Sequence, residues 1–212
     1  MLENIPTKQA DHVLLRLTAS RSAKAVFDSM FEGALDSQDL AEIRRLMPAA
    51  KWSGDPWDAI GSQFEVRSAA PLSDRTRFSD GSKRVYYSAL DLATTIEERL
   101  HWFRKESQPN RVVRLYLRLL QCDFAGSTKD LVPHANALPF LTSEDGYSQC
   151  NALANEAIAC GVDALLTPSA RRAGGTCVPV FSERSLSNPA FTSSHVFEFT
   201  PRGGNGYTVI EI

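Results

Sequence analysis

A turn containing a serine and paired glycines, set between two apolar runs, is the feature that most constrains the fold of this chain. The largely apolar residues 162–166 lead into Ser169, and Gly174 and Gly175 precede a second apolar run at 176–181. Short apolar runs bounded by turn residues are typical of buried strands. Glycines permit positive φ angles and close backbone approach, so the N–H groups of such a turn can form an anion-binding nest. The sequence therefore predicts two strands joined by a ligand-binding turn.

The rest of the chain alternates between strand and helix patterns. Period-two or apolar runs predict strands, and apolar residues at helical spacing predict helices. Besides 164–166 and 176–181, we expect strands at 12–17, 85–90, 111–122, 196–199 and 207–212. We expect helices at 20–34, 36–47, 91–105 and 147–160, and a loop at 133–144.

Two residues are expected to set helix boundaries, and one segment to lack regular structure. Asp91 is a good N-cap for the 91–105 helix, and Gly161 a left-handed cap after the 147–160 helix. Residues 51–74 are rich in proline and glycine, which predicts irregular structure. Together the pattern predicts an α+β fold. We expect one domain, 1–212, with a mixed β-sheet and with 20–74 as a mostly helical insertion packed on the same core.

Charge and composition limit the partners. The chain has 212 residues, is 43% hydrophobic and carries a net charge of −2, which suits one globular domain. Such a charge gives no general attraction to nucleic acid or to an anionic membrane, so we expect neither as a direct partner. An anionic ligand must then be bound by local arginines. No apolar run approaches the roughly 20 residues of a membrane span, and the N-terminus has no signal pattern, which predicts a cytoplasmic protein.

The cysteines and histidines do not suggest a metal site or a disulfide framework. The four cysteines are widely spread with no Cys-x-x-Cys pair, and the four histidines show no ligand spacing. Cys150 and Cys160 fall in a helical pattern and are expected to be ordinary buried thiols. We therefore expect no metal.

A second motif joins an arginine, an aromatic hydroxyl and a carboxylate. Arg77-Phe-Ser79 precedes a glycine turn, Tyr87 lies on the 85–90 strand, and Glu98 lies on the helix that follows. With the serine turn, this order resembles the RES domain family, named for an arginine, a glutamate and a serine. The family pattern reads Arg-Phe-Asn, a glycine turn, Tyr-x-Ala and Thr-Ala-x-x-Glu. Here Ser79 replaces the asparagine, and Glu97 is the alternative carboxylate if the register begins at Tyr86.

The resemblance also assigns an arginine on the first strand. In the family such an arginine enters the ligand cleft, and Arg16 stands at the matching place; the alternative is a surface arginine. Arg67 and Arg75 are alternatives to Arg77, although Arg77 alone is followed by Phe-Ser-x-Gly.

The resemblance implies a fold like that of ADP-ribosyltransferase toxins, with NAD as substrate and no cofactor. Glu98 and Tyr87 would be catalytic: the carboxylate would stabilise a sugar cation, and the tyrosine would stack on nicotinamide or bind the ribose. The NAD-binding residues implied are Arg16, Arg77, Ser79, Ser169, Arg171, Gly174 and Gly175.

The leading functional hypothesis is a bacterial toxin that cleaves the nicotinamide–ribose bond of NAD, as a glycohydrolase or a phosphorylase. The family resemblance implies a cognate antitoxin of helix-turn-helix type. One alternative is ADP-ribosyl transfer to a specific cellular protein. Another is a non-catalytic domain that binds a nucleotide or a protein. The acceptor stays open, and the β-rich stretch 196–212 leaves room for a homodimer.

Overall fold

The computed structural model describes residues 2–19, 55–64, 76–106, 113–199 and 207–211. The helices expected at 20–34 and 36–47 lie outside these residues, as do Arg67 and Arg75. Of the expected insertion 20–74, only one helix falls within them.

The described residues form a seven-stranded sheet of order β1-β2-β5-β4-β3-β6-β7. Its strands are β1 (Thr7–Ala19), β2 (Tyr86–Ala89), β3 (Val113–Asp130), β4 (Ala164–Pro168), β5 (Thr176–Val180), β6 (Leu186–Phe199) and β7 (Tyr207–Glu211). The pairing of β3 with β4 is parallel and the others are antiparallel. The sheet is therefore mixed, which confirms the predicted α+β class.

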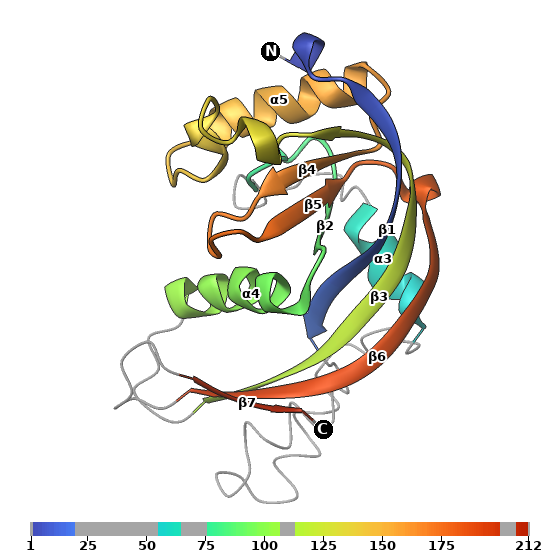
Figure 1. The fold of residues 1–212 in the computed structure, drawn as a ribbon. Coiled ribbons are helices and arrows are strands. Elements are labelled where there is room, and N and C mark those ends of the chain that lie inside the picture. The colour runs from blue at the N-terminus through green and yellow to red at the C-terminus, as the bar shows by residue number, and fades with distance from the viewer. Residues whose placement is uncertain (1, 20–54, 65–75, 107–112, 200–206, 212) are drawn as a thin grey trace, which may run out of the picture.

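Strands β1 and β3 also pair with each other, so the sheet closes on itself. β3 carries β1 along one edge, and along the other it carries first β6 and then β4. The ring is completed by β5, β2 and a single register pair between Leu15 of β1 and Ala89 of β2. Figure 1 shows β1, β3 and β6 as long curved strands that face the β4–β5 hairpin and β2.

The long strands extend beyond their predicted bounds. β1 begins at Thr7 instead of 12, β3 runs on to Asp130 instead of 122, and β6 begins at Leu186 instead of 196. The added residues are largely polar, so they lack the apolar alternation that reveals a strand. Their backbone groups are satisfied by antiparallel pairing, from Thr7 opposite Lys129 through to Ala19 opposite Leu117. Pairing with a neighbour, not local propensity, sets these ends.

The two predicted central helices form as expected. α4 (Leu92–Glu106) begins at Asp91, whose carboxylate accepts from the backbone N–H of Thr94 at 2.9 Å and from its hydroxyl at 2.6 Å. Its Leu92, Ile96 and Leu100 pack in a cluster with residues of β1, β3 and β6. α5 (Tyr147–Ala159) is followed by Cys160 and then by Gly161, whose φ of +70° turns the chain away from the helix.

A third helix corrects the expectation that 51–74 is irregular. α3 (Pro56–Phe64) forms because Asp55 accepts from the N–H of Trp57 at 2.9 Å and Pro56 occupies the first turn, where its missing N–H is not needed. Ile60 is fully buried among residues of β1, β2 and β3. The prolines and glycines of this segment suggest broken structure, but Asp55 followed by Pro56 is a pattern that begins a helix.

Smaller details also differ from expectation. The loop expected at 133–144 contains two short 3₁₀ helices, Val132–His134 and Pro139–Leu141. Cys150 is buried as expected, but Cys160 is exposed because it follows the last turn of α5. All four cysteines are free thiols. No helix in the described residues combines the length and the apolar character that a membrane span needs.

Candidate functional site

A cavity of about 520 Å³ lies where β1, β2 and the β4–β5 hairpin meet. Helices α3 and α4 complete its wall, together with residues 76–78 and the first residue of α5. The volume falls in the range of roughly 300–1,000 Å³ that is usual for small-molecule sites. The wall includes Glu98 and four arginines: Arg16, Arg77, Arg99 and Arg171. Glu98 is the only acidic residue among the described residues of this wall.

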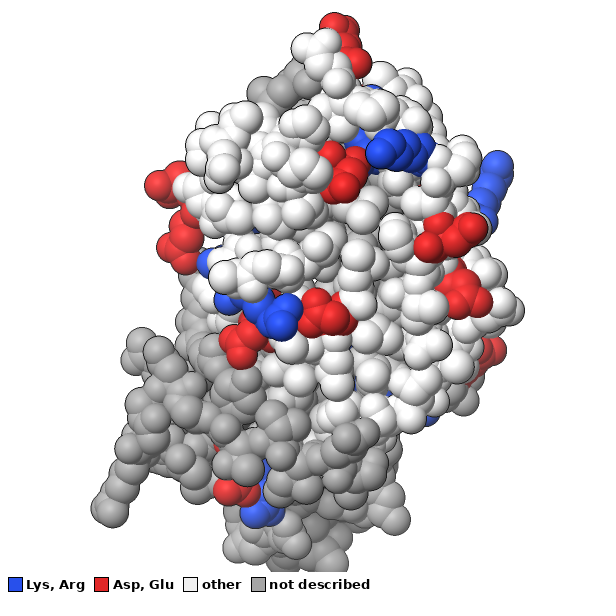
Figure 2. Space-filling model, viewed as in Figure 1, with Lys and Arg blue, Asp and Glu red and all other residues white. Residues whose placement is uncertain are grey.

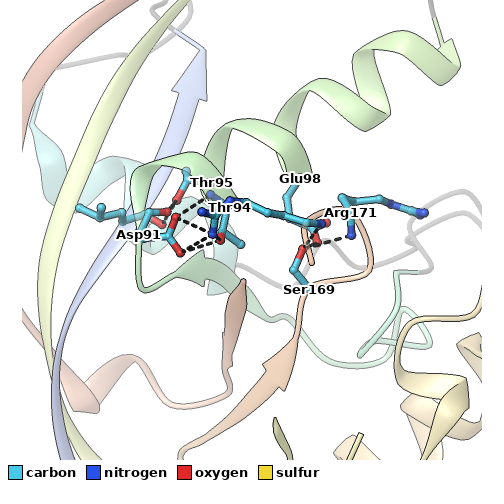
Figure 3. Close-up of polar contacts among 8 residues, drawn as sticks. Asp91, Thr94, Thr95, Glu98, Ser169 and Arg171 are labelled. Carbon is cyan, nitrogen blue, oxygen red and sulfur yellow. Dashed lines mark hydrogen bonds and ion pairs between the residues drawn. The ribbon is translucent and has the colours of Figure 1, made fainter. Parts of the chain in front are cut away.

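Glu98 reaches the cavity from the second turn of α4. It lies one turn after Thr94 and Thr95, which are held at the start of the helix by Asp91 (Figure 3). Its Oε1 lies 2.6 Å from the hydroxyl of Ser169. Within the described residues its second oxygen, Oε2, makes no hydrogen bond. Glu97 is absent from the cavity wall, so the structure favours Glu98 for the family carboxylate.

Ser169 orients the carboxylate of Glu98. Its Oγ accepts from the backbone N–H groups of Arg171 at 3.1 Å and Arg172 at 3.0 Å. A hydroxyl has one proton and two lone pairs, and these two bonds use both lone pairs. The proton is therefore directed to Glu98, as Figure 3 shows. The N–H groups of Arg171 and Arg172 are thus used by Ser169, and that of Gly175 by the carbonyl of Arg172, so these three donors are not available to an anion.

Cys177 is a second group that contacts Glu98, and no sequence pattern indicates this role. It lies on β5 in the cavity wall, with Sγ 3.4 Å from Oε1 of Glu98. Burial and then the charge of Glu98 raise the pKa of the Cys177 thiol, so it stays a neutral donor. A cysteine in an apolar strand looks like a core residue in a sequence. Only the pairing of β5 between β2 and β4 brings it opposite α4.

Arg16 lies in the cavity wall, as the family resemblance implied, and is held by uncharged groups. Its Nη1 donates to the carbonyl of Tyr87 at 2.6 Å, and its Nη2 to Oε1 of Gln63 at 2.9 Å. Its guanidinium lies over the ring of Tyr86, 5.3 Å from the centroid. Burial, and to a lesser extent the nearby Arg99, lower the pKa of Arg16. Its buried Nε has no partner among the described residues.

Arg77 lines the cavity and also holds the segment before α5. Its Nη1 donates to the carbonyls of Ser143 at 2.8 Å, Leu141 at 3.1 Å and Phe140 at 3.4 Å. Its guanidinium lies 4.9 Å from the ring centroid of Tyr147. Its Nη2 is buried and has no partner in the described residues. One side of Arg77 is thus structural, while the other keeps unused donors.

Tyr87 contributes to the wall, but its hydroxyl is engaged in the protein. The hydroxyl accepts from the N–H of Phe78 at 2.9 Å and lies 2.6 Å from the hydroxyl of Thr76. Burial raises the pKa of Tyr87 to about 12. The expected hydrogen bond from this hydroxyl to a ribose would therefore have to replace existing contacts.

Four expected ligand residues lie outside the cavity wall: Ser169, which reaches the site only through its hydrogen bond to Glu98, and Ser79, Gly174 and Gly175. Ser79 donates to the carbonyl of Lys83 and accepts from the N–H of Gly81 at 3.1 Å, so it closes its own turn. Gly174 has a φ of +74°, which the turn requires. At Gly175 an added Cβ would stand 2.4 Å from Oγ1 of Thr94, so this glycine lets the turn approach α4. These residues shape the site and do not face its interior.

The two arginines of the turn have separate places. Arg171 lines the cavity and lies 3.6 Å from Glu144, a residue with a side chain 71% exposed. Arg172 pairs with Asp91 at 3.3 Å and with the hydroxyl of Thr94 at 3.2 Å, joining the turn to the start of α4. Of the two, only Arg171 lines the cavity.

The charge of the site is local. The described residues on the face shown in Figure 2 carry scattered acidic and basic side chains without a continuous basic patch. The cavity wall, in contrast, sets four arginines against one carboxylate. This excess of positive charge in the wall favours an anionic ligand. In the described ranges, no group of three or more His, Cys, Asp or Glu side chains is placed to hold a metal ion.

Two comparisons with known proteins gave a match. The chain resembles a chain in the crystal structure of the M. tuberculosis MbcT–MbcA toxin–antitoxin complex, with a TM-score of 0.47 and 17% identity over 92% of this chain and 87% of that one. No curated protein matched. The model of the RES domain matches residues 40–200, about three quarters of the sequence. By this match, the chain is a member of the RES domain family.

Proposed function

We propose that this protein cleaves the nicotinamide–ribose bond of NAD and acts as a toxin neutralised by a cognate antitoxin. The observation that carries the proposal is Glu98, which lines a cavity walled by arginines and is oriented there by the hydroxyl of Ser169. Membership of the RES family supports the toxin role and an antitoxin partner, which we expect to be of helix-turn-helix type. NAD enters as substrate, and no cofactor is required.

The cavity offers the two kinds of group that NAD cleavage needs. Guanidinium groups bind a diphosphate through charge-assisted hydrogen bonds, and Arg16 and Arg77 each keep a buried nitrogen without a described partner. Cleavage of the glycosidic bond develops positive charge on the ribose, which a fixed carboxylate stabilises. Oε1 of Glu98 is held by Ser169 and Cys177, which leaves Oε2 for the sugar.

The reaction is a displacement at the anomeric carbon of the ribose. The bond from that carbon to the ring nitrogen breaks, and nicotinamide leaves as a neutral molecule with the bonding electron pair. An oxygen of the acceptor then bonds to the carbon. Water gives ADP-ribose and a proton, whereas inorganic phosphate gives ADP-ribose 1″-phosphate. The role of Glu98 is the same for both acceptors.

An NMR assay tests this proposal and identifies the acceptor. Purified protein is incubated with NAD in the presence and absence of phosphate. Release of nicotinamide with ADP-ribose identifies a glycohydrolase, and a phosphate-dependent sugar phosphate identifies a phosphorylase. Intact NAD after long incubation would refute cleavage and favour a binding domain. Labelled bands after incubation with labelled NAD and cell lysate would favour ADP-ribosyl transfer to a protein instead.

The toxin role has its own test. Expression should arrest growth, and Glu98→Gln should relieve the arrest without lowering the protein level. Co-expression of the neighbouring gene's product should also relieve it if that product is the antitoxin. Growth arrest that persists in Glu98→Gln would separate toxicity from the proposed chemistry.

A further inference from the structure

The guanidinium of Arg16 is held in place by groups that carry no charge. Within the described residues it contacts a backbone carbonyl of β2, a side-chain amide from α3 and an aromatic ring of β2. A carboxylate partner would hold an arginine equally well but would neutralise it. Neutral acceptors fix the orientation of Arg16 and leave its positive charge for another partner.

The amide is Gln63, near the end of α3. It lies on the same side of this helix as Ala59, one turn earlier, and both residues line the cavity. The helix is anchored by Ile60, which is fully buried, and by Phe64, which stacks on Tyr86 with centroids 6.4 Å apart. α3 is therefore fixed on both sides of Gln63, and the amide is presented to Arg16 from a rigid element.

The surroundings of this contact are positively charged. Arg99 lines the same cavity, and its positive charge contributes to lowering the pKa of Arg16, as a neighbouring like charge does. Nε of Arg16 is buried without a described partner. Two neighbouring guanidinium groups in a partly buried cavity are stabilised by an anion between them or beside them. A diphosphate meets this requirement.

We propose that Gln63 is a positioning residue that orients Arg16 toward the diphosphate of the substrate while leaving its charge unneutralised. This inference rests on the proposed NAD-cleaving function. In this proposal α3, which belongs to the segment expected to be an insertion, holds one of the arginines that would bind the diphosphate.

The test is the isosteric substitution Gln63→Glu, with ADP-ribose and NAD as probes. The new carboxylate would pair with Arg16, so the melting temperature should stay the same or rise. The Kd for ADP-ribose and the KM for NAD should increase on the order of tenfold, because the arginine is now neutralised. The kcat at saturating NAD should stay within about twofold, since Glu98 is untouched.

Two further variants make the result specific. Gln63→Leu removes the acceptor without adding charge, and we expect an increase in Kd of about threefold. Gln9→Glu adds the same charge at an exposed position of β1, roughly 23 Å along the strand from Arg16, and should leave the Kd unchanged. A decrease in affinity for Gln63→Glu that exceeds both variants, with stability kept, supports the proposal.

Other outcomes overturn it. If Gln63→Glu binds ADP-ribose as tightly as the unmodified protein, or loses stability and affinity together, Gln63 has no such role. If the unmodified protein binds ADP-ribose but leaves NAD intact, cleavage fails while the Kd series still decides the role of Gln63. If it cleaves NAD and Gln63→Glu retains the same Kd and KM, the inference about Gln63 fails alone.

Discussion

The carboxylate side and the guanidinium side of the cavity are built in opposite ways. Glu98 has one oxygen fixed by two donors, a hydroxyl and a thiol, both from the β4–β5 hairpin. Arg16 and Arg77 are held by carbonyls, an amide and rings, which leave their charges available. The first arrangement orients a group, and the second preserves charge. Changes on the carboxylate side should therefore alter turnover, and changes on the guanidinium side should alter binding.

Glu98→Gln should give the largest effect. It keeps volume and one hydrogen-bonding oxygen but removes the charge that stabilises the sugar cation. We expect kcat to fall on the order of a hundredfold to a thousandfold, while the Kd for NAD changes by less than about threefold. Steady-state kinetics and calorimetry measure the two. Glu97→Gln is the matched control and should retain activity; the reverse pattern would show that Glu97 is the functional carboxylate.

Arg77→Ala should act on binding and on the loop before α5. The Kd for NAD should rise about tenfold because a charged donor is lost. The free energy of unfolding should fall by about 1–3 kcal/mol, because the carbonyls of Leu141 and Ser143 lose their donor. Calorimetry and chemical denaturation report the two effects. A loss of stability with unchanged Kd would assign Arg77 to the loop alone.

Ser169→Ala should lower turnover through Glu98. The substitution removes the 2.6 Å contact with Oε1 and leaves the N–H groups of Arg171 and Arg172 without their acceptor. We expect kcat to fall about tenfold and the free energy of unfolding to fall by about 1–2 kcal/mol. Ser187→Ala, at an exposed position of β6, is the control. Weaker NAD binding with normal kcat would instead make Ser169 a direct ligand.

Tyr87→Phe should have the smallest effect on activity. Its hydroxyl bonds to Thr76 and Phe78, so we expect turnover within about twofold and a stability loss of about 1 kcal/mol. A larger loss of kcat would restore the catalytic role first expected for this residue.

The same variant has a pH signature. The pKa of Tyr87 is raised from 10.0 to about 12, so its contribution to stability is complete below pH 10 and is lost as the pH rises toward 12. Tyr87→Phe should remove part of that alkaline decrease in stability. Tyr86, whose pKa burial also raises, accounts for another part. Denaturation followed at several pH values between 8 and 12 would measure the difference.

The sequence predicted the parts of the site that local pattern encodes. The Ser169 turn between two strands, the Asp91 cap and the apolar stripe of α4 all form as expected, and Arg16 reaches the cavity. The family resemblance was needed to select Glu98, because a glutamate beside an apolar helix stripe is usually solvated.

The site residues that the sequence did not indicate reach the site through contacts between distant segments. Cys177 approaches Glu98 only because β5 lies between β2 and β4. Gln63 approaches Arg16 only because α3 packs against residues of β1, β2 and β3. Neither position carries a local pattern that indicates a role in a site. The same limit applies to Ser79, Ser169, Gly174 and Gly175, because a motif does not reveal which of its residues line the cavity and which support those that do.

Gly175 sets a distance across the site without contacting anything that reacts. Because it has no side chain, the hairpin turn can rest directly against Thr94 at the start of α4. A single methyl group at this position would act as a spacer and separate the serine from the acid it orients. Such a variant would keep every functional group of the site and would still lose the proposed NAD-cleaving activity.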